Sequence, residues 1–287
     1  MNGRQRGTLY LCATPIGNLE DVTLRVLRVL QEVDFIAAED TRRTRKLLAH
    51  YGIHTRLISY HEHNRRTKGA RLLNLLQEGK QVALVTDAGL PGISDPGEEM
   101  VALALANGIK VVPVPGPNAA LTALVASGLP AGRFSFEGFL PVQAGARMDR
   151  LQSLKEETRT LIFYEAPHRL QETLQDLLTV LGDRKIAVAR ELTKVHEEIW
   201  RGNLSAAPAY FQNPRGEFTL VVAGAEKTET VGQEPPSRPL IAEKVAALEA
   251  GGRDRRQAIK EAARLLKMSR REVYSALVQA KEKQTPE

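Results

Sequence analysis

The chain has 287 residues, of which 43% are apolar and 26% are charged, enough for about two or three domains with a substantial core. This composition excludes disorder as the main state. No segment approaches the roughly 20 consecutive apolar residues of a membrane helix, and the N-terminus lacks a signal-peptide core, so we expect a soluble cytoplasmic protein without a membrane partner. The single cysteine, Cys12, excludes a disulfide framework and fits a small apolar residue in a strand.

The formal net charge of +6 is concentrated near the C-terminus. Residues 238–287 contain 12 Lys and Arg against 7 Asp and Glu, whereas residues 1–237 contain 28 against 27. A nearly neutral body with a basic C-terminal segment indicates a polyanionic partner, because cations that neutralise phosphates release condensed counterions. Solvated helix surfaces would explain the same charges without a partner.

Short apolar runs alternate with stretches of helical periodicity between residues 8 and 131. We expect strands at 8–14, 34–38, 56–59, 81–86 and 110–115, and helices at 21–33, 41–51, 64–79 and 96–108. The first helix is expected to start from an Asp21 cap, and two others to end at Gly79 and Gly108. The alternation predicts a parallel sheet covered by helices on both faces.

A second block begins near residue 159, after a link at 133–148 that contains Gly and Pro. Its pattern predicts strands at 160–165, 185–192, 196–202 and 217–224 and one helix at 168–182, which indicates a mixed sheet. The segment that follows is polar and contains the adjacent prolines Pro235 and Pro236, which predicts a linker. Three short helices at 240–250, 254–267 and 269–283, the last capped by Ser269, are similar to a helix-turn-helix. The expected organisation is an N-terminal α/β domain (1–132), a second α/β domain (133–226), a linker (227–237) and a basic helical domain (238–287).

Polar, Gly- and Pro-rich segments follow all five predicted strands of the first block, where ligands of open α/β sheets bind. These segments are residues 14–18, 39–42, 60–64, 87–97 and 115–120. Glycines permit close approach to the backbone and prolines stiffen the loops, so together they predict a preformed rim that suits a nucleoside-like ligand. Turn geometry alone is the alternative explanation for each segment.

Several site types are disfavoured by missing motifs. The chain lacks G-x-x-x-x-G-K-[ST], and no G-x-G-x-x-G follows the first strand, which disfavours NTP hydrolysis and NAD chemistry. His61 and His63 lack the H-E-x-x-H pattern or a nearby Cys, so no metal centre is predicted. Ser94 lies outside any G-x-S-x-G elbow.

Eight strings occur in order within residues 8–195: TPIGNLEDVTLRVL, AEDTRRT, SYHEHN, VTDAGLPGISDPG, VPVPGPNAALTAL, EGFLP, LIFYEAPHRL and VARELTK. Together they closely resemble the bacterial small-subunit ribosomal RNA (cytidine-2′-O)-methyltransferase family of the tetrapyrrole methylase class. The resemblance implies an α/β, two-domain tetrapyrrole-methylase-like fold with a parallel N-terminal sheet and a mixed second sheet. It also implies a homodimer that binds S-adenosyl-L-methionine between the domains. The methyl acceptor would be a cytidine ribose 2′-hydroxyl in the decoding region, on naked RNA or on the assembled small ribosomal subunit.

The resemblance also carries a set of cofactor-binding residues, matched motif by motif. Two departures are visible: Leu90 stands where the family often has Thr, and Gly-Leu-Pro replaces the Gly-Asp-Pro of the class, so we expect mainly backbone contacts in this loop. The implied cofactor-binding residues are Pro15, Asp87, Ala88, Gly89, Ile93, Ser94, Asp95, Ala119 and Ala120 from the first domain, and Tyr164, Glu165, Leu192 and Thr219 from the second.

Methyl transfer to a hydroxyl needs in-line alignment of two reactants and a group that accepts the hydroxyl proton; no metal is required. His61, Asp40 and Glu39 are the candidate bases, although Glu39 would alternatively pair with Arg42 and Asp40 would cap the following helix.

Clustered cations are candidate phosphate contacts: Arg42, Arg43, Arg253, Arg255, Arg256, Arg270 and Arg271. A helical domain that serves only packing or dimer contacts is the alternative for the C-terminal group.

Two other functions stay open at the level of sequence. One is methylation of a small macrocycle such as a porphyrinoid, by analogy of fold. The other is a non-catalytic regulator that senses a nucleoside in the body and binds nucleic acid through the C-terminal domain. Transfer of a labelled methyl group to RNA would separate both from the RNA methyltransferase.

Overall fold

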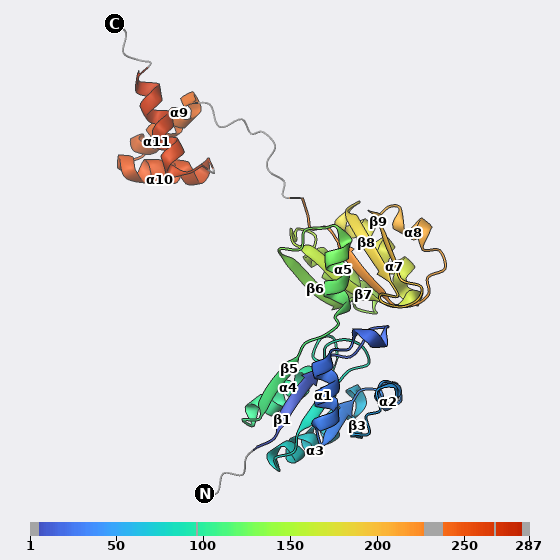
Figure 1. Ribbon diagram of the computed structural model, residues 1–287. Coiled ribbons are helices and arrows are strands. Elements are labelled where there is room, and N and C mark those ends of the chain that lie inside the picture. Colours follow the sequence, from blue (N-terminus) through green and yellow to red (C-terminus); the bar gives the residue numbers. More distant parts are fainter. Residues whose placement is uncertain (1–5, 96, 227–237, 267, 283–287) are drawn as a thin grey trace, which may run out of the picture. The chain divides into compact units, whose positions relative to one another are not determined.

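The computed structural model of the chain describes residues 6–95, 97–226, 238–266 and 268–282 (Figure 1). It divides into two compact units, Met1–Glu226, here called the body, and Lys227–Glu287, here called the helical unit. The predicted linker 227–237 lies outside the described residues. No helix in the described part of the chain is long and apolar enough to cross a membrane.

The first sheet of the body is entirely parallel, as predicted, with the strand order β3-β2-β4-β1-β5. Its strands are β1 (Thr8–Cys12), β2 (Phe35–Ala38), β3 (Arg56–Ser59), β4 (Val82–Val85) and β5 (Lys110–Val114). Its helices are α1 (Leu24–Glu32), α2 (Thr41–His50), α3 (Arg65–Gln77) and α4 (Gly97–Ala106), with short 3-10 turns η1 (Leu19–Asp21) and η2 (Glu62–Asn64).

Helices cover both faces of this sheet, which explains why its strands read as continuous apolar runs. In β4, Ala83 and Val85 pack into a core that contains residues of α1 and α2. Val82 and Leu84 point to the opposite face and join a core that contains residues of α3 and α4. All four residues of β4 are buried.

The predicted start of α1 is wrong by two residues. Asp21 ends the η1 turn, and α1 begins after Thr23, whose side-chain oxygen accepts a hydrogen bond from the Val26 amide at 3.2 Å. The extended backbone of Thr23 lets its hydroxyl reach the first free amides of the helix. The predicted ends of α3 and α4 are confirmed, since Gly79 and Gly108 adopt positive φ just beyond them.

The second sheet of the body is mixed, as predicted, with the order β6-β7-β10-β8-β9. The β6 and β7 strands are parallel and the other pairs antiparallel. The strands are β6 (Phe134–Phe139), β7 (Thr160–Glu165), β8 (Lys185–Arg190), β9 (Glu198–Asn203) and β10 (Phe218–Val222). The helices are α5 (Ala119–Ser127), α6 (Ala144–Ser153), α7 (Leu170–Leu181) and α8 (Ala207–Tyr210), with the turn η3 (Pro167–Arg169).

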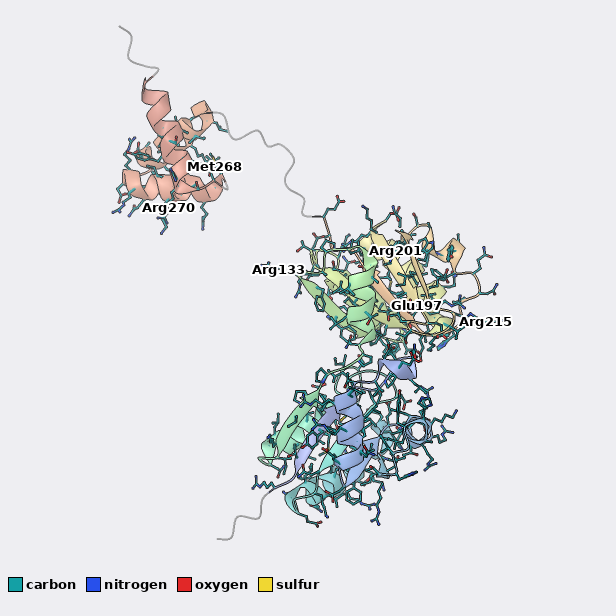
Figure 2. All side chains as sticks on the ribbon, in the orientation of Figure 1. Arg133, Glu197, Arg201, Arg215, Met268 and Arg270 are labelled. Atoms are coloured by element: carbon teal, nitrogen blue, oxygen red, sulfur yellow. The ribbon has the colours of Figure 1, made fainter. Side chains whose placement is uncertain are left out.

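Helix α5 follows the last strand of the first sheet yet packs on the second. Ala120, Ala123 and Leu124 share a core with residues of β7, β8 and β10. Arg201 of β9, labelled in Figure 2, donates from Nε to the Ala126 carbonyl of α5 at 3.1 Å. The opposite face of the sheet packs against α6, α7 and α8.

The predicted link at 133–148 is wrong, because this segment contains β6 and the start of α6. The glycine that indicated a break, Gly138, instead has a φ of +63° within β6. The pairing with β7 shifts in register between Phe136 and Gly138, so the glycine accommodates a β-bulge.

The helical unit consists of α9 (Arg238–Ala250), α10 (Arg255–Leu265) and α11 (Arg270–Glu282), which pack on one another. Its core is built from small and branched residues such as Ile241, Val245, Ala262 and Val273. The predicted cap of the last helix is confirmed, since the Ser269 hydroxyl accepts a hydrogen bond from the Glu272 amide at 3.2 Å.

Candidate active site

A cavity of about 340 Å³ lies in the body, at the carboxyl ends of the first-sheet strands. Loops that follow β1, β2, β4 and β5 line one side of it, and residues of β6, β7, β8, β10 and their loops line the other. Its volume is within the range of sites for small organic ligands. Because both sheets contribute, the cavity depends on the tertiary arrangement of the body.

Most of the cofactor-binding residues implied by sequence come together in this cavity. Pro15 and Ala120 do not line it, although their neighbours Ile16 and Ala119 do. The implied residues that line it are Asp87, Ala88, Gly89, Ile93, Ser94, Asp95, Ala119, Tyr164, Glu165, Leu192 and Thr219.

Two carboxylates stand side by side where β2 and β4 end. Glu39 Oε2 accepts hydrogen bonds from the Thr86 hydroxyl at 2.7 Å and from the Asp87 amide at 3.3 Å. Asp87 Oδ1 in turn accepts from the Asp40 amide at 3.0 Å, and its Oδ2 lies 3.4 Å from Arg43. Burial, reinforced by the negative charge of Glu39, raises the pKa of Asp87. Both carboxylates line the cavity.

Hydrogen bonds made by its backbone groups hold the loop after β4 in place. Gly89 and Thr14 exchange two backbone hydrogen bonds of 2.9 and 3.0 Å, which ties this loop to the end of β1. Asp95 accepts from the amides of Gly92, Ile93 and Gly97, while burial raises the pKa of its carboxyl. These bonds produce the preformed rim that the Gly and Pro content predicts.

The loop after β8 carries cavity-lining Leu192 between two residues with left-handed backbone, Glu191 (φ 51°) and Thr193 (φ 67°). Such a conformation persists for non-glycine residues only when neighbours hold it. Lys194 pairs with Glu191 at 2.8 Å, and the Thr193 amide donates to Glu197, labelled in Figure 2, at 2.5 Å.

This same loop contacts the first half of the body. The Asn18 amide donates to the Thr193 hydroxyl at 3.0 Å. A Cβ on Gly17 would lie 2.8 Å from both the Leu192 carbonyl oxygen and Thr193 Oγ1, so only glycine fits there without displacement. We call the contact of residues 17–18 with residues 192–194 the latch.

Aromatic side chains form the wall contributed by the second sheet. Tyr164 packs against Phe136 and Phe139, with ring centroids 5.0 and 5.6 Å apart. Burial raises the pKa of Tyr164, opposed by a backbone hydrogen bond from Ala120. Beside it, the buried carboxylate of Glu165 accepts a hydrogen bond from the Thr173 hydroxyl at 2.6 Å.

The three candidate bases occupy different environments. Glu39 lines the cavity, whereas Asp40 and His61 do not. Asp40 caps α2 through the Arg42 amide at 2.8 Å, and the hydrogen bonds from Arg42 lower the pKa of Asp40 to about 2. The His61 Nε2 lies 3.1 Å from the side-chain nitrogen Nδ2 of Asn64, on the turn beyond edge strand β3.

The predicted phosphate contacts also differ in their environments. Arg43 lines the cavity, and Arg42 is 84% exposed on α2. In the helical unit, Arg253 pairs with Glu261 at 2.6 Å and Arg255 lies 3.5 Å from Glu249. The remaining three, Arg256, Arg270 and Arg271, are exposed and form no ion pair among the described residues.

Sequence reasoning did not assign several lining residues. Asn118 and Phe139 belong to the quoted strings VPVPGPNAALTAL and EGFLP, so their motifs already marked them. Glu217 lies just before β10 and Phe218 is its first residue, and neither belongs to a motif that would have distinguished it. Ala189 reaches the cavity through the register of β8, which no local pattern encodes.

The two-sheet fold and the cavity between the sheets define a class of protein. Residues 8–208 match the family model of the Tetrapyrrole (Corrin/Porphyrin) Methylases, and the chain belongs to this family. The crystal structure of uroporphyrin-III-C-methyltransferase from Thermus thermophilus has the same fold, with a TM-score of 0.56 and 24% identity over 76% of this chain and 94% of that chain.

Within the family, the chain groups with proteins named Ribosomal RNA small subunit methyltransferase I. The protein of this name from Synechocystis sp. is 52% identical over 276 residues, which cover 93% of this chain and 96% of the relative. The one from Halalkalibacterium halodurans is 56% identical over 227 residues, 78% of each chain. The family resemblance seen in the sequence motifs is thus confirmed.

Proposed function

We propose that this protein transfers the methyl group of S-adenosyl-L-methionine to the ribose 2′-hydroxyl of a cytidine in the decoding region of small-subunit ribosomal RNA. The name of its relatives supports the small-subunit RNA as substrate. The cytidine, its 2′-oxygen and the decoding region rest on the eight sequence strings within residues 8–195. The single observation that carries the proposal in the structure is the charge of the cavity.

The described residues that line the cavity fit this cofactor. They include five carboxylates, those of Glu39, Asp87, Asp95, Glu165 and Glu217, and one cationic side chain, Arg43, which already faces Asp87. Outside the lining, Lys194 pairs with Glu217 at 2.9 Å and Arg169 lies 3.6 Å from Glu165, so Glu39 and Asp95 are the lining carboxylates without a cationic partner among the described residues. Such a lining favours a ligand that carries a sulfonium and an ammonium group, and it opposes a nucleoside triphosphate. Apolar and aromatic surfaces from Ile16, Ala119, Tyr164 and Leu192 suit the adenine ring.

When bound, the cofactor supplies an electrophilic methyl group, and the protein must align the acceptor hydroxyl and remove its proton. Of the three candidate bases, we propose Glu39. Its Oε2 is held by Thr86 and Asp87, whereas its Oε1 accepts no hydrogen bond from the described residues and is available to a substrate hydroxyl. Asp40 is a weaker base because its pKa is only about 2.

The first experiment supplies labelled S-adenosyl-L-methionine with assembled small subunits or with naked small-subunit RNA, both from cells that lack this enzyme. Nuclease digestion then locates the label. We expect it on a cytidine 2′-oxygen. Label on a base, or no label on either substrate despite cofactor binding, would contradict the proposal.

The role of Glu39 is tested with Glu39→Gln, which preserves the shape and the acceptor oxygen toward Thr86. We expect kcat to fall by about 10²- to 10⁴-fold, whereas the Kd of the cofactor should rise by a smaller factor because only one of the five carboxylates in the cavity lining is lost. His61→Asn, a change outside the cavity lining, is the control and should retain kcat within about threefold. Loss of activity in the His61 variant alone would reassign the base.

The resemblance also leads us to propose that the protein acts as a cytoplasmic homodimer. Light scattering of the purified chain across a concentration series tests the assembly. A mass of one chain at all concentrations would contradict it.

A further inference from the structure

The helical unit carries a second concave site, an open groove of about 740 Å³ between α10 and the first turns of α11. We call it the basic groove. Arg255, Arg256 and Lys260 line it from α10, and Arg270 and Tyr274 line it from α11. None of these residues belongs to the cavity of the body.

The groove has a strong excess of positive charge. Its one acidic residue, Asp254, uses its carboxylate to cap α10, accepting a hydrogen bond from the Gln257 amide at 2.8 Å. Arg256, Lys260 and Arg270 form no ion pair with any described residue. Unpaired cations on two facing helices favour a ligand with several phosphates in series.

An exposed aromatic ring stands among these cations. Tyr274 is 59% exposed, although its neighbour Val273 is fully buried in the core of the unit. Tyr274 lies four residues after Arg270, labelled in Figure 2, so both side chains project from the same face of α11. An aromatic ring beside cations is the arrangement by which proteins stack an unpaired base while holding its backbone.

The shape of the site favours a single strand over a duplex. In a helix-turn-helix that reads a duplex, the start of the last helix inserts into the major groove. Here Arg270 and Tyr274, at the start of α11, form a wall of a concave surface. A flexible strand with an unstacked base can enter such a surface.

We propose that the basic groove binds an unpaired segment of the RNA substrate, with phosphates on Arg256, Lys260 and Arg270 and one base stacked on Tyr274. The identity of the strand as RNA rests on the proposed function. The groove supplies affinity for the substrate, and the cavity of the body supplies the chemistry.

The test measures binding of the full-length chain to a fluorescent single-stranded RNA of about 12 nucleotides, a length typical of such sites, by anisotropy over a series of salt concentrations. The groove variant is Arg256→Ala with Arg270→Ala. The matched control is Lys244→Ala with Arg264→Ala, which removes the same charge from the helical unit at exposed positions outside the groove.

We expect the groove variant to bind at least about tenfold more weakly, with the slope of log K against log salt reduced by about 1.4, since each lost single-strand phosphate contact contributes about 0.7. The control should stay within about twofold. Tyr274→Ala should weaken binding about tenfold at an unchanged salt slope, whereas Tyr274→Phe should keep the affinity. Equal losses in both double variants, no effect of Tyr274→Ala, or tighter binding of duplex DNA would each overturn the proposal.

The same variants separate this proposal from the proposed function. In the methyl-transfer assay, the groove variant should raise KM for RNA and leave kcat unchanged. Groove-dependent binding without methyl transfer would refute the proposed function and uphold the groove. Methyl transfer with KM unchanged in the groove variant would refute the groove and uphold the function.

Discussion

Substitution of Gly17 by Ala tests whether the latch controls the cavity. The added Cβ would lie 2.8 Å from the Leu192 carbonyl oxygen, and ordinary van der Waals contact begins at 3.4 Å. The backbone of the 191–194 loop must therefore move by about 0.6 Å, and overpacking of this kind costs about 1–3 kcal/mol. Leu192 moves with the loop because Glu191 and Thr193 on either side are held in left-handed conformations.

This displacement would carry Leu192 away from its place in the cavity lining, so a bound cofactor would lose contact with this side chain. Since 1.4 kcal/mol corresponds to a tenfold change, we expect the Kd for S-adenosyl-L-methionine to rise about tenfold by calorimetric titration. The Tm of the body should fall by about 2–12 °C, since 1 kcal/mol shifts the Tm of a domain of this size by about 2–4 °C. Gly145→Ala is the control, since nothing lies within 4 Å of its added Cβ in helix α6. Unchanged Kd and Tm in Gly17→Ala would refute the latch.

Three further outcomes are expected. Arg147 is 1% exposed and pairs with Asp176 at 2.6 Å and with Glu172 at 2.5 Å. Arg147→Ala should therefore lower the free energy of unfolding by about 3 kcal/mol in denaturant titration, whereas Glu172→Gln, a change at an exposed carboxylate, should lower it by less than about 1 kcal/mol. Equal losses in the two variants would contradict this prediction. Burial raises the pKa of Cys12 from 9.0 to about 12, so the folded chain should resist thiol reagents at pH 8. Because the thiol ionises first in the unfolded chain, stability should also fall as pH rises from about 9 to 12, and a flat profile there would refute the shift. Asn118→Ala should cost about 1 kcal/mol by removing the cap of α5, whereas Asn118→Asp should retain stability in a thermal melt.

Local patterns were most reliable where burial or turn geometry acts on neighbouring residues. The fully buried run of β4 and the left-handed glycines after α3 and α4 were predictable because these signals are local. The prediction of a link at 133–148 failed at Gly138, because a glycine in a β-bulge and a glycine in a link have the same sequence signature. Only the pairing partner, β7, distinguishes the two.

The candidate site likewise combines features that neighbouring residues predict with features that depend on strand order. Residues after each strand of the first block were expected to form a rim, since the carboxyl ends of parallel strands meet at one edge. Which of them reach the cavity depends on the strand order β3-β2-β4-β1-β5. Glu39 follows inner strand β2 and lines the cavity, while His61 follows edge strand β3 and does not.

The sequence by itself determined the classes of sheet, the family, and the loop segments that form the rim, because periodicity, turn residues and motif strings are properties of contiguous residues. Tertiary structure alone decided that Leu192 and Tyr164 face Asp87 across one cavity, and that Arg256 and Tyr274 share one groove. These residues are distant in the chain or lie on different helices, and their proximity depends on strand order, register and helix packing, which no local pattern specifies.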